Sequence, residues 1–188
     1  MSTTATFDIS KFTGAFKAGG ARPNLFEVKI TGNPASLSVP DNFQFLCKAS
    51  QLPVSTIGTI EVPYFGRSVK VAGDREFTEF TTTVINDETF GTRNLIERWI
   101  NLLNTHKGNK SVVNLGDRSS SGGYTGTLEL HTYTKKGAND QKWEFQGCWP
   151  SNVSTIDLNW DSVNTLQEYT ITWQYDTYLH LNAKVGKN

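Results

Sequence analysis

The sequence has no excess of charge of either sign, little cysteine and no long hydrophobic run. Its 18 lysines and arginines balance its 18 aspartates and glutamates, and neither sign is gathered into a tail. A protein that grips nucleic acid by the phosphate backbone normally carries a basic excess, so the balance argues against that class. A net charge near zero also promotes self-association, which suits an assembling subunit better than a free monomer.

No apolar stretch is long enough to span a bilayer, so we expect no membrane segment. The first ten residues also lack the basic-then-apolar order of a secretory signal. The two cysteines, Cys47 and Cys148, belong to no Cys-x-x-Cys pair and lie in strand-like segments. We therefore expect buried thiols in a reducing compartment. A disulfide between them stays open, because sequence does not supply its geometry.

What the sequence does have is an abundance of β-forming residues, with 12% aromatics and frequent Thr, Val and Ile. Apolar and polar residues alternate along much of the chain, and this alternation predicts strands. The predicted strands are 24–30, 43–49, 59–62, 68–71, 77–85, 125–135, 142–149 and 167–179. In the second of these, Phe43, Phe45 and Cys47 share one face.

The last two predicted strands separate their faces most clearly. The first has an apolar face of Trp143, Phe145, Gly147 and Trp149. The second has an inward face of Tyr169, Ile171, Trp173 and Tyr175. Its outward face consists of Glu168, Thr170, Thr172, Gln174 and Asp176. That outward face contains two acids and no base.

One amphipathic helix is predicted at about 92–105, with Thr89 or Thr92 as its N-cap. Its apolar face is Leu95, Ile96, Trp99, Leu102 and Leu103. The fold class expected is therefore mainly β, an antiparallel β-sandwich or barrel with one covering α-helix. We expect three parts, which are a flexible N-terminal arm (1–20), a single domain (21–180) and a C-terminal tail (181–188).

The segment 50–73 interrupts the regular pattern with proline and glycine, which confine β-structure to sheet edges or extended loops. It predicts a projecting loop or hairpin with an exposed apolar set. The members of this set are Ile57, Ile60, Tyr64 and Phe65. Exposed apolar residues of this kind favour a protein contact.

Candidate sites for chemistry are weak. From Asp157 to Glu168 the acidic and amide residues follow the spacing of a calcium-binding loop, but Ser162 replaces the required glycine. Leu158 and Trp160 alternate with polar residues there, which predicts a half-buried strand instead. We expect no metal, no cofactor and no catalytic residue.

Other residues that resemble functional groups have simpler interpretations. His106, His131 and His180 are dispersed, and none has metal-ligand spacing to another His or Cys. His131 is expected to be a hydrogen-bonded surface residue on a strand. The segment 72–75 predicts a tight turn with a local ion pair. Asp87 and Glu88 precede the helix and complement its dipole, and the serines at 119–121 have no elbow motif.

Six segments, read in order, resemble the tail tube proteins of T4-like contractile-tailed bacteriophages. They are 21–28 (ARPNLFEV), 45–49 (FLCKA) with Leu52 and Pro53, 71–77 (VAGDREF), 83–88 (TVINDE), 149–153 (WPSNV) and 158–162 (LNWDS). No one of these segments carries a mechanism, but the ordered set covers most of 21–178. The arm, the 33–41 insertion and the tail after Leu179 depart from the family.

The resemblance implies a β-sandwich whose strands join those of neighbours in a hexameric ring. The rings stack into a hollow tube inside the contractile sheath, a structural and non-enzymatic part of the virion tail that is assembled in the host cytoplasm. DNA and the tape-measure protein pass through this tube. The further implied partners are the baseplate initiator, the sheath protein and the tail terminator. Ring symmetry requires head-to-tail contacts, in which one surface matches a different one.

Two groups of residues then acquire expected roles. The 50–73 segment is the candidate for contacting the next subunit or ring, with Asp74 and Arg75 anchoring its base. The outward face of 167–179 is the candidate lining of the bore, since DNA must slide without sticking. The competing hypothesis is that this face meets the sheath or solvent.

Two alternatives remain open at this stage. A baseplate tube-initiator paralogue would share the fold and the assembly class. A carbohydrate- or small-ligand-binding β-sandwich would instead use Trp149, Trp160 and Trp173 as a stacking platform, although buried core aromatics explain those residues better.

Overall fold

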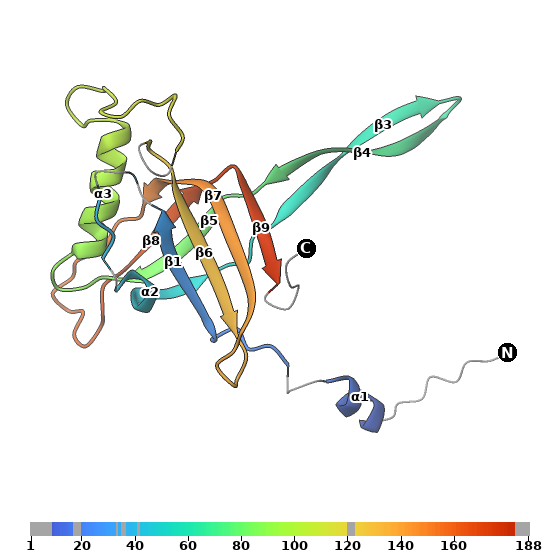
Figure 1. Ribbon diagram of the computed structural model, residues 1–188, viewed down its shortest axis with the longest axis horizontal. Coiled ribbons are helices and arrows are strands. Elements are labelled where there is room, and N and C mark those ends of the chain that lie inside the picture. The colour runs from blue at the N-terminus through green and yellow to red at the C-terminus, as the bar shows by residue number, and fades with distance from the viewer. Residues whose placement is uncertain are drawn as a thin grey trace.

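The computed structural model of the chain describes residues 9–16, 20–32, 34, 37–40, 42–119 and 123–182. The predicted arm and the 33–41 insertion therefore lie partly outside the described residues, and the predicted tail lies outside them beyond residue 182. Figure 1 shows a curved β-sandwich with one long helix beside it and a hairpin that projects far from its body. The elements are α1 (Ile9–Ala15), β1 (Phe26–Gly32), α2 (Phe43–Leu46), β2 (Cys47–Ser50), β3 (Ser55–Tyr64), β4 (Arg67–Phe77), β5 (Phe80–Ile85), α3 (Gly91–Leu103), β6 (Gly126–Tyr133), β7 (Asn139–Val153), β8 (Glu168–Gln174) and β9 (Thr177–Asn182).

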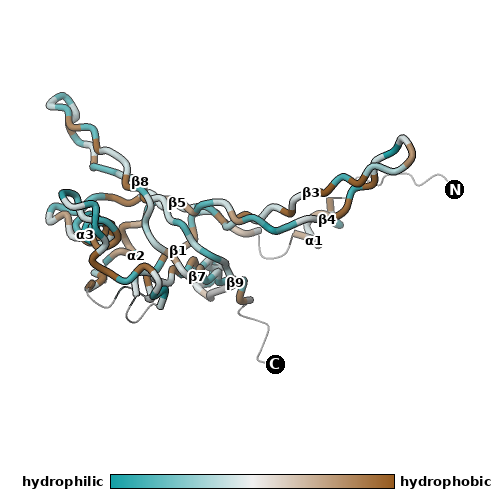
Figure 2. The backbone as a smooth tube through the Cα atoms, turned by 90° about the horizontal axis from the view of Figure 1, so that it is seen from above, coloured by the Kyte–Doolittle hydropathy of each residue, from teal (hydrophilic) through white to brown (hydrophobic). Residues whose placement is uncertain are grey.

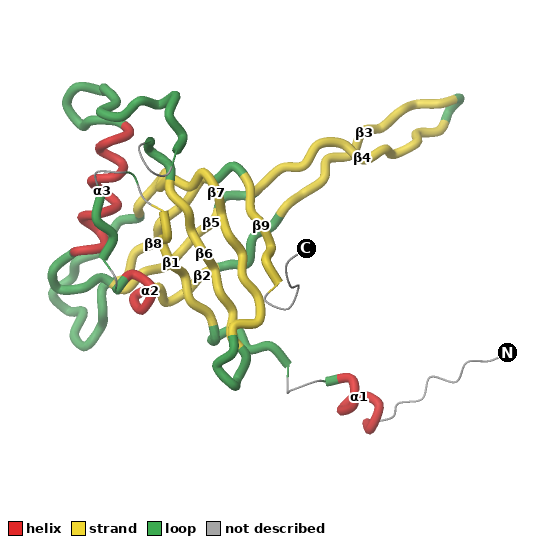
Figure 3. The backbone as a smooth tube through the Cα atoms, in the orientation of Figure 1, coloured by secondary structure: helices red, strands yellow, loops and turns green. Residues whose placement is uncertain are grey.

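The strands of the body pair antiparallel in the order β1-β6-β7-β8-β5-β2, and β9 adds to β7 (Figure 3). The long strand β7 belongs to both layers of the sandwich. Its first half pairs with β6 and β9, and its second half pairs with β8. The bend between the halves lies at Gly147, where φ is +68°. An added Cβ at this glycine would lie 2.2 Å from the Asp176 carboxylate, which would have to move, and the positive φ itself favours glycine.

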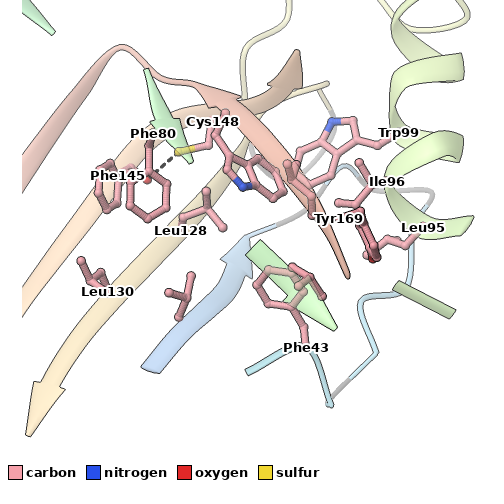
Figure 4. Close-up of a cluster of buried hydrophobic side chains, with 14 residues drawn as sticks. Phe43, Phe80, Leu95, Ile96, Trp99, Leu128, Leu130, Phe145, Cys148 and Tyr169 are labelled. Atoms are coloured by element: carbon pink, nitrogen blue, oxygen red, sulfur yellow. Dashed lines mark hydrogen bonds between the residues drawn. The ribbon is translucent and has the colours of Figure 1, made fainter. Parts of the chain in front are cut away.

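This bend corrects the face predicted for 142–149. Before Gly147 the inward residues are odd-numbered, Trp143 and Phe145, whereas after it the buried residues are Cys148 and Pro150. A bulge inserts one extra residue and so exchanges the two faces of a strand. The switch moves Cys148 into the core, where its thiol donates to the Phe145 carbonyl over 3.3 Å (Figure 4).

The core lies between the two layers and under α3 (Figure 4). Its largest fully buried side chains include Trp99, Trp173, Tyr169 and Phe43. The Trp99 and Trp173 rings meet edge to face with centroids 5.8 Å apart. Each indole N–H has a partner, since Trp99 donates to the Tyr124 carbonyl at 2.7 Å and Trp173 donates to the Thr82 hydroxyl at 3.0 Å. Buried indoles are stable in an apolar core when this polar group is satisfied.

The prediction of a strand over 43–49 is wrong in its first half. Residues 43–46 form the short helix α2, and the strand begins at Cys47. In a helical turn, residues three apart share one side, so Phe43 and Leu46 both reach the core. Phe45 points away and is 77% exposed. Burial of Phe43 therefore outweighs the alternating pattern.

Two longer predicted strands are each divided. The 77–85 strand is the end of β4 followed by β5, and the 167–179 strand is β8 followed by β9. At the break between β8 and β9 the Asp176 N–H donates to the Gln146 carbonyl. There the chain passes from pairing with the second half of β7 to pairing with its first half. The inward residues Tyr169, Ile171 and Trp173 are buried as predicted.

Helix α3 covers the end of the sandwich where β6 begins, as the amphipathic pattern predicts. Its capping differs from the prediction, because the N-cap is Phe90 at φ +54° and no side chain caps it. The Asp87 carboxylate instead accepts from the Gly91 N–H at 3.0 Å, in agreement with the dipole role expected of it. Across the described part of the chain, no helix is both long and apolar enough to cross a membrane.

Candidate functional site

The hairpin β3–β4 is a two-stranded ribbon with one apolar and one polar face. Cross-strand pairing places Ile60 opposite Val71 and Val62 opposite Val69. All four side chains are about half exposed, and Figure 2 shows the hydrophobic colouring along the projection. The other face carries the Glu61–Lys70 pair, with 3.7 Å between the charged atoms. We call the four apolar residues the hairpin apolar face.

The hairpin tip is a tight two-residue turn. Phe65 and Gly66 both have positive φ, +42° and +81°, the arrangement that suits the twist of a two-stranded ribbon. The Phe65 ring is 93% exposed and meets the Tyr64 ring edge to face at 4.7 Å. The chain thus holds a bulky aromatic pair at the far end of its longest projection (Figure 1).

The projecting hairpin consists of residues 55–77, whereas the segment predicted to project is 50–73, and the predicted contact residues are distributed along the hairpin. Ile57, Ile60, Tyr64 and Phe65 are exposed there. The prediction of a tight turn at 72–75 is wrong, because these residues lie inside β4 and oppose a register shift at Gly58. Neither Asp74 nor Arg75 forms an ion pair with any described residue.

Three residues of the hairpin apolar face, Val62, Val69 and Val71, are not among the predicted contact residues. The signal for them was present, since the alternation in 59–62 is mirrored in 68–71 about Phe65-Gly66. Pairing those two short pieces as a hairpin places their apolar residues on one face.

The five residues predicted to line a bore lie on the outward side of β8 and at its end. Thr170 and Thr172 lie opposite Thr83 and Thr81 of β5, and the Thr83 and Thr170 hydroxyls are 3.5 Å apart. Gln174 donates to the Glu79 carboxylate at 3.0 Å. The central part of this face is therefore a layer of short polar, uncharged side chains.

The description of this face as two acids without a base does not hold in three dimensions. The Lys48 ammonium lies 2.6 Å from the Glu168 carboxylate, and Arg118 binds both carboxylate oxygens of Asp176 at 2.5 and 2.7 Å. Lys48 lies on β2, beyond β5 in the same sheet, and Arg118 lies in a distant loop, so linear spacing could not find them. Glu168 and Asp176 are therefore each paired with a cation.

The outward side of β1, β6 and β7 carries a denser charge network. Glu129 contacts the Lys142 ammonium and the His131 ring, each at 2.9 Å, and Lys142 approaches Glu144 at 3.7 Å. Burial alone would raise the pKa of Glu129, but hydrogen bonds from Lys142 and His131 outweigh it and lower the pKa. His131 is hydrogen-bonded as predicted, yet it is buried rather than on the surface.

The loop between β7 and β8 contradicts the half-buried strand expected at 157–161. Leu158, Trp160, Val163 and Leu166 are all strongly exposed, and Trp160 is 102% exposed. Trp160 is thus not a core residue, whereas Trp173 is buried. The separation of these two indoles removes the three-tryptophan stacking platform.

Cys47 and Cys148 are free thiols. Burial raises the pKa of each to about 12, which keeps both protonated and poorly nucleophilic. Nowhere in the described ranges do three or more His, Cys, Asp or Glu side chains gather as a possible metal site.

Comparison with known proteins agrees with this arrangement. Residues 21–181 match the phage tail tube protein family. The tail tube protein gp19 of Enterobacteria phage T4 is 33% identical over 174 residues, which span 89% of this chain and 97% of the relative.

Solved structures of low identity show the same fold. A chain of the anti-feeding prophage baseplate is 13% identical with a TM-score of 0.63, covering 88% of this chain and 98% of that chain. A chain of the sheath–tube complex of an extracellular contractile injection system, in the extended state, is 14% identical with a TM-score of 0.59, covering 97% and 100%. The chain therefore belongs to the phage tail tube protein family, as a structural subunit of the virion tail.

Proposed function

We propose that six copies of this chain close into a ring and that the rings stack into the hollow inner tube of a contractile tail. The observation that carries this proposal is the hairpin apolar face, which no described part of the chain covers. An isolated two-stranded ribbon is only marginally stable in water, so a second surface is needed to bury it. Six-fold symmetry was applied to the related baseplate, and this supports the ring number.

The hairpin, with Ile57, Ile60, Tyr64 and Phe65 exposed along it, contacts the adjacent subunit or the next ring. Asp74 and Arg75 have no ion-pair partner among the described residues and are available to pair across that contact. Such a contact is heterologous, because the hairpin of one copy meets a different surface of another. Each added copy then presents a fresh hairpin, which allows growth into a tube.

The outward face of β8 lines the bore, and DNA passes over it without specific binding. Its threonines are uncharged, and its two carboxylates are neutralised by Lys48 and Arg118. A bore without free cations offers phosphates no site at which to stick. The balanced pairs also avoid strong repulsion of DNA.

The partners of this tube are the sheath protein outside it, the baseplate initiator and tail terminator at its ends, and the tape-measure protein within. The sheath–tube complex among the similar structures supports the first of these. The chain acts as a conduit and carries no catalytic activity.

Electron microscopy of the purified chain, first dilute and then concentrated, tests the assembly. Negative stain is expected to show long hollow tubes of constant bore. Short rings that never elongate would favour the baseplate-initiator paralogue. Dispersed monomers, even with a baseplate nucleus added, would contradict the proposal.

The double substitution Thr170→Lys with Thr172→Lys is expected to slow DNA ejection roughly tenfold, because unpaired cations in a bore bind passing phosphates. Ejection from virions carrying the variant tube would be measured by the release of labelled DNA. The double substitution Thr170→Gln and Thr172→Gln is the matched control, since it adds length without charge. Normal ejection from intact lysine-variant tubes would contradict the proposal that this face lines the bore.

A further inference from the structure

A groove of about 1100 Å³ lies at the end of the sandwich away from α3. Helix α3 packs where β6 begins, because its Trp99 ring fills the space beside Gly126. The groove lies where β6 ends, between that end, the start of β1 and the end of β2. Its main apolar lining residues are Pro23, Leu25, Phe26, Leu52, Leu130 and Trp143.

The rim of the groove is basic. Arg22, Lys135 and Lys136 line it and are exposed, and no acidic side chain is among its described lining residues. None of the three cations forms an ion pair within the described parts of the chain. A surface of this kind suits an occupant that is apolar in its centre and acidic at its edges.

One segment of the chain has this chemistry. The loop of residues 154–167, which we call the Trp160 loop, holds the exposed Leu158 and Trp160 between Asp157 and Asp161. It contains no lysine or arginine. Neither aspartate carboxylate has an ion-pair partner among the described residues.

We infer that the groove receives the Trp160 loop of a neighbouring copy. The indole of Trp160 enters the apolar floor, and Asp157 and Asp161 face the three rim cations. In Figure 1 the loop lies below α3, whereas the β6–β7 turn that carries Lys135 and Lys136 lies at the foot of the sandwich. The two surfaces belong to different places on the molecule, as a head-to-tail contact requires. This inference rests on the proposed assembly and names the surfaces that meet in it.

Charge distinguishes this occupant from two other exposed apolar segments, the α1 stripe and the hairpin tip. The stripe on and beside α1 consists of Ile9, Phe12 and Phe16, and its one charged neighbour within the helix is Lys11. The hairpin tip carries Arg67 opposite Tyr64. Both would bring a cation toward a basic rim, and like charges across an interface weaken binding.

Charge reversal in the loop, Asp157→Lys with Asp161→Lys, tests the pairing. The protein concentration needed for tube assembly is expected to rise roughly tenfold or more, because five cations then meet in one interface. Reversal of the rim in the same chain, Lys135→Asp with Lys136→Asp, is expected to restore assembly. The monomer melting temperature controls for folding and is expected to stay unchanged, since all four side chains are exposed.

The outcomes separate the two proposals. Tubes that form normally from the loop variant overturn this inference and leave the proposed function intact. A wild-type chain that forms no tubes overturns both. Loss of assembly that the rim reversal does not restore also overturns the pairing.

Photo-crosslinking identifies the surface that Trp160 contacts. With benzoylphenylalanine at position 160 of assembled tubes, crosslinks are expected to residues 20–26 or 130–136 of another copy. Crosslinks to the hairpin, residues 55–77, would overturn the inference.

Discussion

The double variant Val62→Glu with Val69→Lys is expected to prevent tube formation at concentrations at which the wild-type chain assembles, while leaving the monomer folded. The two residues lie opposite each other on the hairpin apolar face and are about half exposed in the single chain. Their replacements form a neutral cross-strand pair like that of Glu61 and Lys70, so the hairpin itself keeps its stability. In the tube, burial of the exposed half of the two valines is lost, which costs about 1.5–3 kcal/mol per subunit.

A loss of this size raises the concentration needed for assembly by a factor of about 10 to 150. Sedimentation and negative-stain microscopy measure this, and circular dichroism with thermal melting checks the monomer. The matched control is Thr59→Glu with Ala72→Lys, which places the same ion pair on the polar face of the same hairpin. Tubes from the first variant at wild-type concentrations, or equal loss in both variants, would contradict the role of this face.

The substitution Trp173→Ala is expected to cost about 3–5 kcal/mol of the free energy of unfolding. Trp173 is 0% exposed and packs edge to face on Trp99. Its removal leaves a cavity and deprives the buried Thr82 hydroxyl of the indole N–H that it accepts at 3.0 Å. For a chain of this length the melting temperature should fall by about 6–20 °C.

The same substitution at Trp160 is the matched control. That side chain is fully exposed, so Trp160→Ala should change the monomer unfolding free energy by less than about 0.5 kcal/mol. Denaturant unfolding under conditions that keep both variants monomeric compares them directly. Similar losses in the two variants would mean that one of the two indoles is misplaced in the fold.

Trp160 and Trp173 also show the limit of predicting burial from a local alternating pattern. Both alternate with polar neighbours in the sequence, and alternation predicts burial for each. Trp173 lies within the strand β8, which is paired on both sides, with β5 and with β7. Trp160 lies in a loop and not in a paired strand, so the alternation around it does not bring its side chain against the core.

The candidate bore-lining face, on the outward side of β8, shows the same limit for predicting the local charge. The residues of the face were correctly identified as an outward set, but their neutralising partners are Lys48 and Arg118. Lys48 lies 120 residues from Glu168 along the chain, and Arg118 lies 58 residues from Asp176, which is farther than a local sequence motif extends.

The sequence by itself determined the β-rich class, the amphipathic helix, the projecting segment and the family, because each depends on local periodicity or on ordered short segments. Tertiary structure decided where Gly147 exchanges the faces of β7, why Phe43 is helical, and which cations balance Glu168 and Asp176. It also brought the groove lining together from four separate segments, residues 20–26, 50–52, 130–136 and 141–143. The physical reason is that burial and pairing depend on residues distant in the chain, whereas periodicity reports only on neighbours.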